Sequence, residues 1–365
     1  MISRARQTPR RQRVNAMALD ANGHPVSRIA QRKLEHLRLS LEASVQSTRG
    51  AGFERFAFTH QALPNLDLDA IDTTTSFLGK PLKLPFLISS MTGGAQAAGD
   101  INRRLALVAQ TVGIAFGVGS QRAGLTHKDL RPTYQVRSVA PDVLLFANLG
   151  AVQLNYGMRK EQCLEAIEMI GADALVLHLN PLQEALQPEG DHNFKGLIEK
   201  IAMLCQELPV PVIVKEVGCG ISEQTATLLA QAGVAAIDVA GLGGTSFARV
   251  EAFRRERPEE VELALAFSEW GIPTAEALVA THRAAPRLPL IASGGLHHGL
   301  DAAKAIGLGA DLTGFAHAVL AAASEGEEPV RRLLDGFAWQ LRVAMFCAGA
   351  PNIATLKANP PVEVR

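Results

Sequence analysis

Residues 211–241, PVIVKEVGCGISEQTATLLAQAGVAAIDVAG, contain the unit of sequence that decides the fold of this chain. The apolar runs at 211–218 and 235–241 predict strands, and the stretch 222–232 between them predicts a helix. Both runs are mostly apolar and do not alternate regularly with polar residues, which is typical of strands that are covered on both faces. A strand, a helix and a second strand in this order favour a parallel sheet.

The same alternation of apolar runs and helical stretches extends in both directions from this unit. The other six predicted strands are 84–90, 114–119, 143–150, 174–180, 289–295 and 310–316. The other predicted helices include 100–112, 160–170, 195–207, 274–285 and 298–306. Eight strands fit a closed (β/α)8 barrel better than an open doubly wound sheet, which has about five to seven. We therefore expect an α/β protein built on a (β/α)8 TIM barrel.

The segments on either side of the barrel differ from it in composition. Residues 1–28 hold six arginines and one acidic residue, which favours a disordered tail, with an organelle-targeting segment as the alternative. Residues 29–83 are expected to form an N-terminal extension that leads into the barrel at 84–357 and caps its active-site face. Residues 358–365 are expected to form a C-terminal tail.

The composition narrows the class of protein. The 365 residues are 47% hydrophobic and carry equal numbers of basic and acidic residues, so the formal net charge is zero. A neutral chain with few aromatic residues argues against bulk binding to nucleic acid or to an anionic membrane. The four cysteines lie far apart, and no apolar run reaches the ~18 residues that span a bilayer. We expect a cytoplasmic protein without a zinc site or a disulfide framework.

Polar residues gather at the C-terminal ends of the predicted strands, the rim where barrels carry their functional residues. They include 89–94, 119–122, Asn148, His178 and Lys215. Helix capping explains small polar residues at this rim, and we assign Ser222, Thr274 and Asp100 to capping alone. Capping does not explain an arginine, a lysine and a histidine, which are seldom buried without partners. The rim is therefore the predicted site.

Three local features indicate what such a site would bind. Gly294 and Gly295 follow the seventh strand, where barrels bind phosphate and where backbone N–H groups can approach an anion. Lys215 requires a partner, either a flavin whose reduced ring it stabilises or a neighbouring acidic residue. Glu184, beside Gln183, would hold a divalent ion together with a diphosphate, or would simply favour the first turn of a helix.

Two further features depend on segments outside the barrel repeat. Arg32 and His36 share one face of a predicted helix at 28–43, which is useful only if this helix folds over the barrel mouth. Trp270 lies in the long connection after the sixth strand, and it acts there either as part of a lid or as a packing anchor.

Taken together, the motifs of this chain resemble those of type 2 isopentenyl-diphosphate isomerases. The matching stretches are RKLEH (32–36), SSMTGG (89–94), GSQR (119–122), NLG (148–150), HLNPLQE (178–184), KEVGCGIS (215–222), DVAGLGGTSF (238–247), WGIPT (270–274), ASGGLHHG (292–299) and AMFCAGAPNIATL (344–356). The resemblance spans about residues 28–357, and the ordered combination of SMTGG, GSQR and HLNPLQE is its most specific part.

The resemblance implies an isomerase that interconverts isopentenyl and dimethylallyl diphosphate with reduced FMN, with Mg²⁺ on the diphosphate and NADPH to reduce the flavin. The residues implied to contact FMN are Ser90, Met91, Thr92, Ser120, Asn148, Lys215, Thr245, Gly294, Gly295, Leu296, Ala316 and His317. Those implied to bind substrate are Arg32, Lys33, Ser120, Gln121, Arg122 and Gln183, and Glu184 is implied to bind Mg²⁺. The implied catalytic residues are His178, Gln183, Glu184 and Lys215.

The chain departs from the pattern of this family at three places. Phe247 stands where a tryptophan is usual, and the loop GGLHHG at 294–299 lacks the usual arginine-type residue. Ala318 lies where a proline is expected. The last two departures concern the contacts to the FMN phosphate.

Two other classes of protein remain open from the sequence. An FMN-dependent oxidoreductase of the 2-hydroxy-acid oxidase type shares the barrel and the strand-end lysine, but it needs a His-Gly-Gly-Arg loop where this chain has Leu-Gly-Gly-Thr at 242–245. A binding module without catalysis would require the polar rim to be accidental. The expected partners are a small-molecule diphosphate and further copies of this chain in a homo-oligomer, with neither nucleic acid nor membrane.

Overall fold

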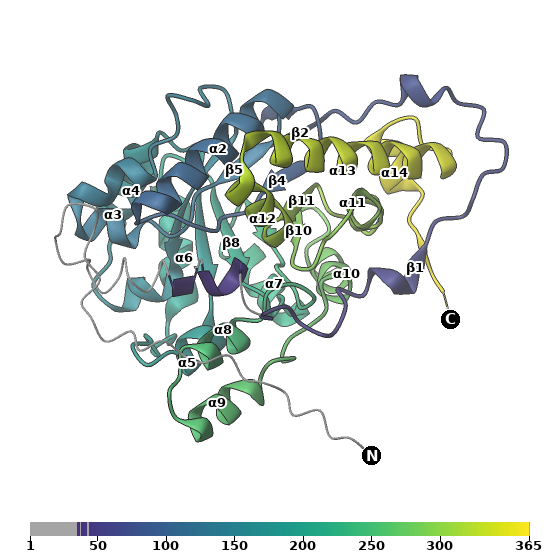
Figure 1. Ribbon diagram of the computed structural model, residues 1–365. Coiled ribbons are helices and arrows are strands. Elements are labelled where there is room, and N and C mark those ends of the chain that lie inside the picture. Colours follow the sequence, from purple (N-terminus) through teal and green to yellow (C-terminus); the bar gives the residue numbers. More distant parts are fainter. Residues whose placement is uncertain (1–34, 37, 42–43, 365) are drawn as a thin grey trace, which may run out of the picture.

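The computed structural model describes residues 35–36, 38–41 and 44–364 of the chain. Eight parallel strands close into a barrel in the order β4-β5-β6-β7-β8-β9-β10-β11, and β11 pairs with β4 (Figure 1). They are β4 (Phe86–Ile88), β5 (Ala115–Gly117), β6 (Leu145–Gly150), β7 (Ala174–Leu179), β8 (Val212–Glu216), β9 (Ala236–Asp238), β10 (Leu290–Ser293) and β11 (Leu312–Phe315). Each of the eight predicted strands contains one of them, so the predicted barrel is confirmed.

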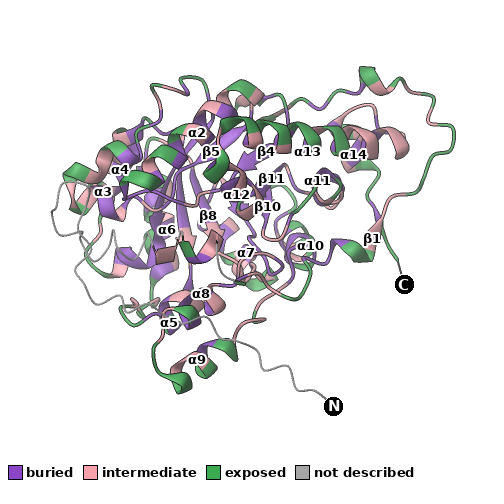
Figure 2. Cartoon of the chain, in the orientation of Figure 1, coloured by how far each residue is buried: buried purple, intermediate pink, exposed green. Residues whose placement is uncertain are grey.

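Helices surround the barrel, both between successive strands and after the last strand. They are α2 (Gln96–Val112), α3 (Arg122–Thr126), α4 (Lys160–Ile170), α5 (Pro181–Leu186), α6 (Leu197–Glu207), α7 (Glu223–Gln231), α8 (Phe247–Phe253), α9 (Pro258–Leu265), α10 (Thr274–Ala284), α11 (Gly299–Gly307), α12 (His317–Glu325), α13 (Glu327–Cys347) and α14 (Ile353–Ala358). Figure 2 shows the burial that this arrangement produces, with buried strands at the centre and exposed positions on outer helices such as α13. The strands are buried on both faces, which is why they read as continuous apolar runs.

The N-terminal end of the barrel is closed by a hairpin from the lead-in segment. Strands β2 (Thr75–Phe77) and β3 (Lys80–Leu82) pair antiparallel, and Phe77 and Leu82 join an apolar cluster inside the barrel. The ring of Phe77 lies 6.4 Å from that of Phe146, near the start of β6. The opposite, C-terminal end is therefore the open end of the barrel.

The two flanking segments meet each other on the surface. Strand β1 (Phe56–Ala57) pairs antiparallel with β12 (Val362–Glu363), so the segments predicted as lead-in and C-terminal tail form a two-stranded sheet. The long helix α13 follows the barrel and packs against α2, α11 and α12 (Figure 1). Its buried residues Leu334, Leu341 and Met345 recur at helical spacing on the inner face.

Only one of the three helix caps predicted from sequence is correct. Ser222 caps α7, because its side chain accepts a hydrogen bond from the N–H of Thr225. Thr274 is instead the first residue of α10, and its Oγ1 donates to the carbonyl oxygen of Gly294 at 2.5 Å. Asp100 lies within α2, one turn after its start. Within the described part of the chain, no helix combines the length and apolar character that crossing a membrane requires.

Candidate active site

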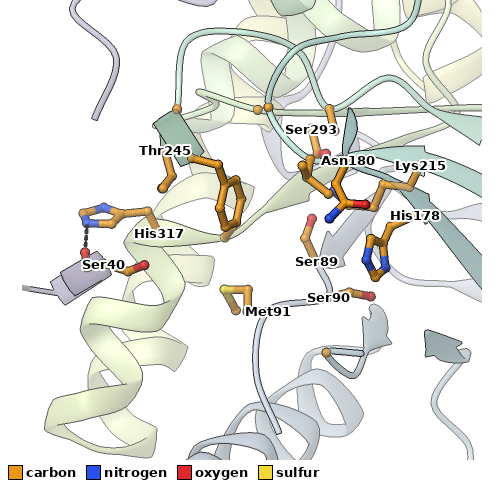
Figure 3. A pocket seen from close by; sticks show the side chains of 18 of the residues that line it. Ser40, Ser89, Ser90, Met91, His178, Asn180, Lys215, Thr245, Ser293 and His317 are labelled. Carbon is orange, nitrogen blue, oxygen red and sulfur yellow. Dashed lines mark hydrogen bonds between the residues drawn. The ribbon is translucent and has the colours of Figure 1, made fainter. Parts of the chain in front are cut away.

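A pocket of about 300 Å³ opens at the C-terminal ends of the barrel strands (Figure 3). It collects most of the residues that the sequence placed at the rim. The predicted residues that line it are Ser90, Met91, Thr92, Ser120, Arg122, Asn148, His178, Gln183, Glu184, Lys215, Thr245, Gly294, Gly295, Leu296, Ala316 and His317. Residues from all eight strands or the loops that follow them therefore converge on one cavity.

Two glycine-rich loops form one wall of the pocket. Gly294 and Gly295 have φ of 97° and 72°, and a Cβ on either would lie within 2.4 Å of the backbone of Gly241 or Gly243. The glycines are required because the loops after β9 and β10 pack backbone against backbone. With no side chains in the way, the backbone of these loops faces the pocket directly, beside the first residues of α12.

Lys215 at the end of β8 lies on the floor of the pocket. Its Nζ donates to the carbonyl oxygen of Glu216 at 2.7 Å and lies 4.0 Å from Oδ2 of Asp238. Asp238 is held in turn by Ser293, whose Oγ donates to Oδ1 at 2.7 Å. Burial raises the pKa of Asp238, and the charge of Lys215 opposes that rise. The lysine thus has an acidic partner and still faces the cavity. The two partners expected from the sequence, a neighbouring acidic residue and a flavin, therefore do not exclude each other.

An amide and carboxylate cluster forms a second wall, on β7 and α5. Nδ2 of Asn180 donates to Oε1 of Gln183 at 3.1 Å and to Oε1 of Glu184 at 2.9 Å. The other oxygen of Glu184 accepts hydrogen bonds from Nε2 of Gln187 and the N–H of Asp191. Pro181 at the first helical position begins α5 directly after the strand, which turns Gln183 and Glu184 back toward the pocket.

His178 lies beside this cluster in an orientation fixed by Asn148. Its Nδ1 is 2.9 Å from Oδ1 of Asn148, so the imidazole nitrogen Nδ1 carries the proton and donates it. Nε2 is left as an acceptor when the ring is neutral. Figure 3 shows His178, Asn180 and Lys215 close together on one side of the pocket, with Thr245 and His317 on the other.

Three buried polar atoms of the pocket have neither a hydrogen-bond partner nor an ion-pair partner in the described structure. They are Oγ of Ser89, Oε1 of Gln46 and Oδ1 of Asn180, and all three residues line the cavity. Buried polar groups are almost always paired, so these atoms indicate a ligand with hydrogen-bonding edges. None of the three is among the residues that the family resemblance implied to contact FMN, substrate or metal. Ser89 and Asn180 belonged to recognisable rim motifs, whereas Gln46 carried no local signal.

The described part of the N-terminal extension covers part of the pocket mouth, whereas most of the helix predicted at 28–43 lies outside the described residues. Residues 35–36 and 38–41 are helical, and Ser40 and His36 line the pocket. Nε2 of His317 lies 3.1 Å from the carbonyl oxygen of Ser40, and Nε2 of Gln46 donates to Oγ1 of Thr245. These contacts join the extension to the loops after β9 and β11.

Some predicted site residues are not at the pocket. Gln121 is fully buried and turned away from it, where Nε2 donates to the carbonyl oxygen of Ala166 and Oε1 accepts from the N–H of Asn148. Its neighbour Arg122 does line the pocket and pairs with Asp191 at 3.0 Å. Arg32 and Lys33 lie outside the described residues.

Trp270 does not cover the main pocket. Its side chain is 63% exposed and packs edge-to-face on Phe267, and it borders a small neighbouring cavity with Leu182 and Gln183. Phe247, which replaces the usual tryptophan, lines both cavities. In the described part of the chain, no group of three or more His, Cys, Asp or Glu side chains is placed to hold a metal ion. A divalent ion here would have to take most of its ligands from a bound molecule.

The strand order places the two walls on opposite sides of the mouth. In the closed barrel, β10 lies four strands from β6, and β11 lies four strands from β7. The glycine loop after β10 therefore faces Asn148 and the Asn180 cluster across the cavity. A ligand that contacts both walls must be elongated and must pass over Ser89, Ser90 and Lys215.

Comparison with known proteins agrees with this geometry. The sequence pattern of the FMN-dependent dehydrogenase family matches residues 38–180 and 182–360. Among solved structures, a lactate oxidase of Pediococcus acidilactici superimposes with a TM-score of 0.66 over 92% of this chain and 94% of its own, at 18% identity. A variant of (S)-mandelate dehydrogenase gives a TM-score of 0.64 over 92% of this chain and 97% of its own, at 19% identity. At this identity the superpositions show the shared barrel fold.

Curated relatives are much closer in sequence. A protein of Synechococcus sp. named isopentenyl-diphosphate delta-isomerase is 53% identical over 91% of this chain and 95% of its own length. Proteins of the same name from Stutzerimonas stutzeri and Rickettsia rickettsii are 50% and 47% identical, over 90% and 92% of this chain and 96% and 97% of their own lengths. The chain therefore belongs to the isopentenyl-diphosphate delta-isomerases, a family of enzymes within the FMN-dependent dehydrogenase fold family.

Proposed function

We propose that this chain interconverts isopentenyl diphosphate and dimethylallyl diphosphate by a 1,3-proton shift, with reduced FMN and Mg²⁺, as a step of isoprenoid biosynthesis. The observation that carries the proposal is the union, in one pocket, of Lys215, the glycine-walled side and the cluster of Asn180, Gln183 and Glu184. The first two suit a flavin and its phosphate, and the third suits a diphosphate with its metal ion. The relatives of the same length and about half-identical sequence support this substrate.

The residues present fit FMN. The buried, unpaired Oγ of Ser89 and Oε1 of Gln46 line the pocket and would pair with the hydrogen-bonding edges of a flavin ring. The loops at Gly294–Gly295 and Ala316–His317 would surround the phosphate, whose negative charge the N-terminus of α12 favours. When bound in reduced form, FMN supplies a planar ring that can give and take a proton beside the substrate.

Lys215 provides a fixed positive charge on the floor of the site. Its ammonium is held between the carbonyl oxygen of Glu216 and the carboxylate of Asp238, and its side chain is only 12% exposed. A cation at this place stabilises negative charge that develops on a bound ring, and a largely dry site strengthens that effect. NADPH is proposed only as the reductant that brings FMN to its active form, because an isomerisation has no net redox change.

The oxygen donors of the second wall fit Mg²⁺, although they supply one carboxylate alone. Glu184 Oε1 and the orphaned Asn180 Oδ1 are hard oxygen ligands, and a diphosphate would complete the coordination. Arg122 at the rim is positioned to bind the same diphosphate, and Arg32 and Lys33 are proposed to do so from the N-terminal extension. Binding of the remote diphosphate then orients the alkene.

The remaining task is to move protons on an unactivated alkene in the absence of bulk water. Met91, Phe247 and Leu296 line the pocket and exclude water from the alkene. His178, Gln183 and Glu184 are polar side chains of the second wall, and we propose that Nε2 of His178 holds the proton while Glu184 binds the metal ion and Gln183 binds the substrate. Asn148 keeps that histidine in a single tautomer.

An oxidoreductase acting on 2-hydroxy acids is the other candidate, because it uses the same barrel. Such enzymes need a base after the sixth strand, and this chain has Leu242, Gly243, Gly244 and Thr245 there. None of these side chains can take a proton from a hydroxy acid. The loop therefore favours the isomerase.

Product analysis with purified protein tests the proposal. The protein is incubated with isopentenyl diphosphate, FMN, NADPH and Mg²⁺, and each component is omitted in turn. We expect dimethylallyl diphosphate only when flavin, a reductant and the metal ion are all present, and no dioxygen consumption with lactate or mandelate. Equal rates with oxidised and reduced FMN would contradict the proposed role of the reduced form. Turnover of a 2-hydroxy acid without isomerisation would favour the oxidase.

A further inference from the structure

His178, Lys215 and Asp238 form a row at the top of the barrel interior. They are register partners on three neighbouring strands, since His178 of β7 pairs with Lys215 of β8, and Lys215 pairs with Asp238 of β9. Residues in register on parallel strands point to the same face of the sheet. The first two line the pocket, whereas Asp238 lies beneath it and is 1% exposed.

The two carboxylate oxygens of Asp238 have different surroundings. Oδ1 accepts hydrogen bonds from Oγ of Ser293 at 2.7 Å and from the N–H of Ala240 at 3.2 Å. Oδ2 is buried without a hydrogen-bond partner in the described structure, and it points to Nζ of Lys215 at 4.0 Å. A buried charge without a partner is costly, so Lys215 is the counter-charge of this carboxylate.

Lys215 is therefore placed between the buried carboxyl group of Asp238 and the pocket. An ammonium group has three donors, and the carbonyl oxygen of Glu216 takes one of them at 2.7 Å. While the ring bound in the pocket is uncharged, Asp238 balances the lysine. When the ring becomes negative, the same ammonium serves two anions on opposite sides.

We propose that Asp238 is a positioning residue that, acting through Lys215, sets how strongly the pocket stabilises negative charge on a bound flavin ring. The inference rests on the FMN site of the proposed function and assigns to this chain the residue that tunes it. Removing the charge of Asp238 leaves the whole ammonium charge to the ring, which favours the reduced, negatively charged form. Removing the charge of Lys215 has the opposite effect and disfavours the reduced, negatively charged form.

Flavin affinity in two oxidation states measures this effect without relying on turnover. Dissociation constants for oxidised and reduced FMN, and the midpoint potential of the bound flavin, are determined for the wild type and for Asp238→Asn. We expect the preference for reduced over oxidised FMN to rise at least tenfold in Asp238→Asn, which corresponds to about 30 mV for a two-electron couple. Lys215→Met is expected to shift the preference at least tenfold the other way.

A matched control removes the same charge at the other end of the barrel. Asp173 pairs with Lys80 at 2.7 Å and with Arg137 at 3.0 Å, before the start of β7. Asp173→Asn should leave the ratio of the two dissociation constants within about threefold of the wild type, because the charge lies far from the pocket mouth and is screened.

The double variant tests whether Asp238 acts through the lysine. Lys215→Met/Asp238→Asn should have the same flavin potential as Lys215→Met alone, and a difference equivalent to tenfold or more would overturn the inference. An unshifted potential in Asp238→Asn would also overturn it. If Asp238→Asn does not fold, the test rests on the flavin potentials of Lys215→Met and of the double variant. The double variant buries no unpaired charge. A wild type that binds no FMN would overturn the proposed function and this inference together, whereas normal FMN binding with unshifted variants would overturn the inference alone.

Discussion

Replacing Glu251 by glutamine should loosen the N-terminal extension from the mouth of the pocket. Glu251 lies on α8 and is fully buried, with Nη1 of Arg254 at 2.6 Å and Nε2 of His36 at 3.2 Å. Nε of Arg254 also pairs with Glu35 at 3.0 Å. One buried carboxylate thus organises the attachment of two consecutive residues of the extension, and one of them, His36, lines the pocket.

The size of the effect follows from what glutamine cannot replace. Burial alone would raise the pKa of Glu251, but His36 and Arg254 hold it below its ordinary value, so the carboxylate is charged at neutral pH. Glutamine keeps one acceptor and loses the charge, and a hydrogen bond to a charged group contributes roughly 1.5–3 kcal/mol. The contact between His317 and Ser40 and the packing of Leu39 on Val250 remain. Opening of the extension should therefore become roughly 10–100 times more frequent.

Limited trypsin digestion and hydrogen exchange measure this opening. Arg38 lies on an exposed position of the extension, so cleavage there should accelerate at least about tenfold in Glu251→Gln. The KM for isopentenyl diphosphate should rise by a similar factor with a smaller change in kcat, while FMN content stays at the wild-type level. Glu189→Gln is the matched control, because Glu189 lies 3.8 Å from the same Arg254 but is 61% exposed. Wild-type rates of cleavage and exchange in a folded Glu251→Gln protein would refute this reasoning.

Three further changes address the core, the phosphate wall and the pH dependence of stability. Burial raises the pKa of Glu216 to about 7. The folded state therefore gains stability from the protonated carboxyl below pH ~4.5 and loses about 3 kcal/mol of it as the pH rises to about 7. Urea unfolding at several pH values should show this loss in the wild type and not in Glu216→Gln. Gly294→Ala would place a Cβ 2.2 Å from the carbonyl oxygen of Gly241, at a φ of 97°. The variant should lower the free energy of unfolding by roughly 2–5 kcal/mol. It should also abolish FMN binding, which flavin fluorescence measures. His297→Arg should tighten FMN binding about tenfold in a fluorescence titration, because arginine offers the phosphate a permanent charge and two donors.

Each of these changes has its own control. Gly336→Ala, at a helical position with no atom within 4 Å of the new Cβ, should be neutral or stabilise the protein by about 0.5–1 kcal/mol. An unaltered FMN affinity in Gly294→Ala would show that the loop does not shape the pocket. A pH profile of stability in Glu216→Gln that parallels the wild type would show that the carboxyl ionises normally. Weaker FMN binding in His297→Arg would mean that residue 297 does not face the phosphate.

The barrel could be predicted from sequence because its signals are local. A strand buried on both faces appears in the sequence as a short, mostly apolar run, such as PVIV at the start of 211–218, and each predicted run contains an observed strand. The rim residues follow from the same signal, since a residue after a parallel strand must lie at the C-terminal edge. Lys215 and Glu184 are at the pocket for that reason alone.

Features that depend on contacts between distant segments could not be predicted in this way. Gln121 and Arg122 are adjacent polar residues of one motif, yet Gln121 turns toward Ala166 on α4 and only Arg122 reaches the pocket. Gln46 is brought to the site by its contact with Thr245, 199 residues away. Thr274 does not cap its helix, because its hydroxyl is used by Gly294 in another loop. Which neighbour a polar side chain meets is a property of the closed barrel.

The closed strand order also gives the two walls of the pocket different chemistry. The wall after β9, β10 and β11 is built from backbone, because Gly294 and Gly295 must pack against Gly241 and Gly243, so it can bind an anion without a specific side chain. The wall on β6, β7 and α5 is built from side chains that hold one another, such as Asn180 and Glu184, and its chemistry depends on each of them. Substitutions in the first wall should therefore change cofactor affinity through loop geometry, whereas substitutions in the second should change turnover with the cofactor in place. Lys215 lies between the two walls, so its charge acts on a ligand bound to either of them. Asp238, which belongs to neither wall, lies 4.0 Å from its Nζ and balances that charge.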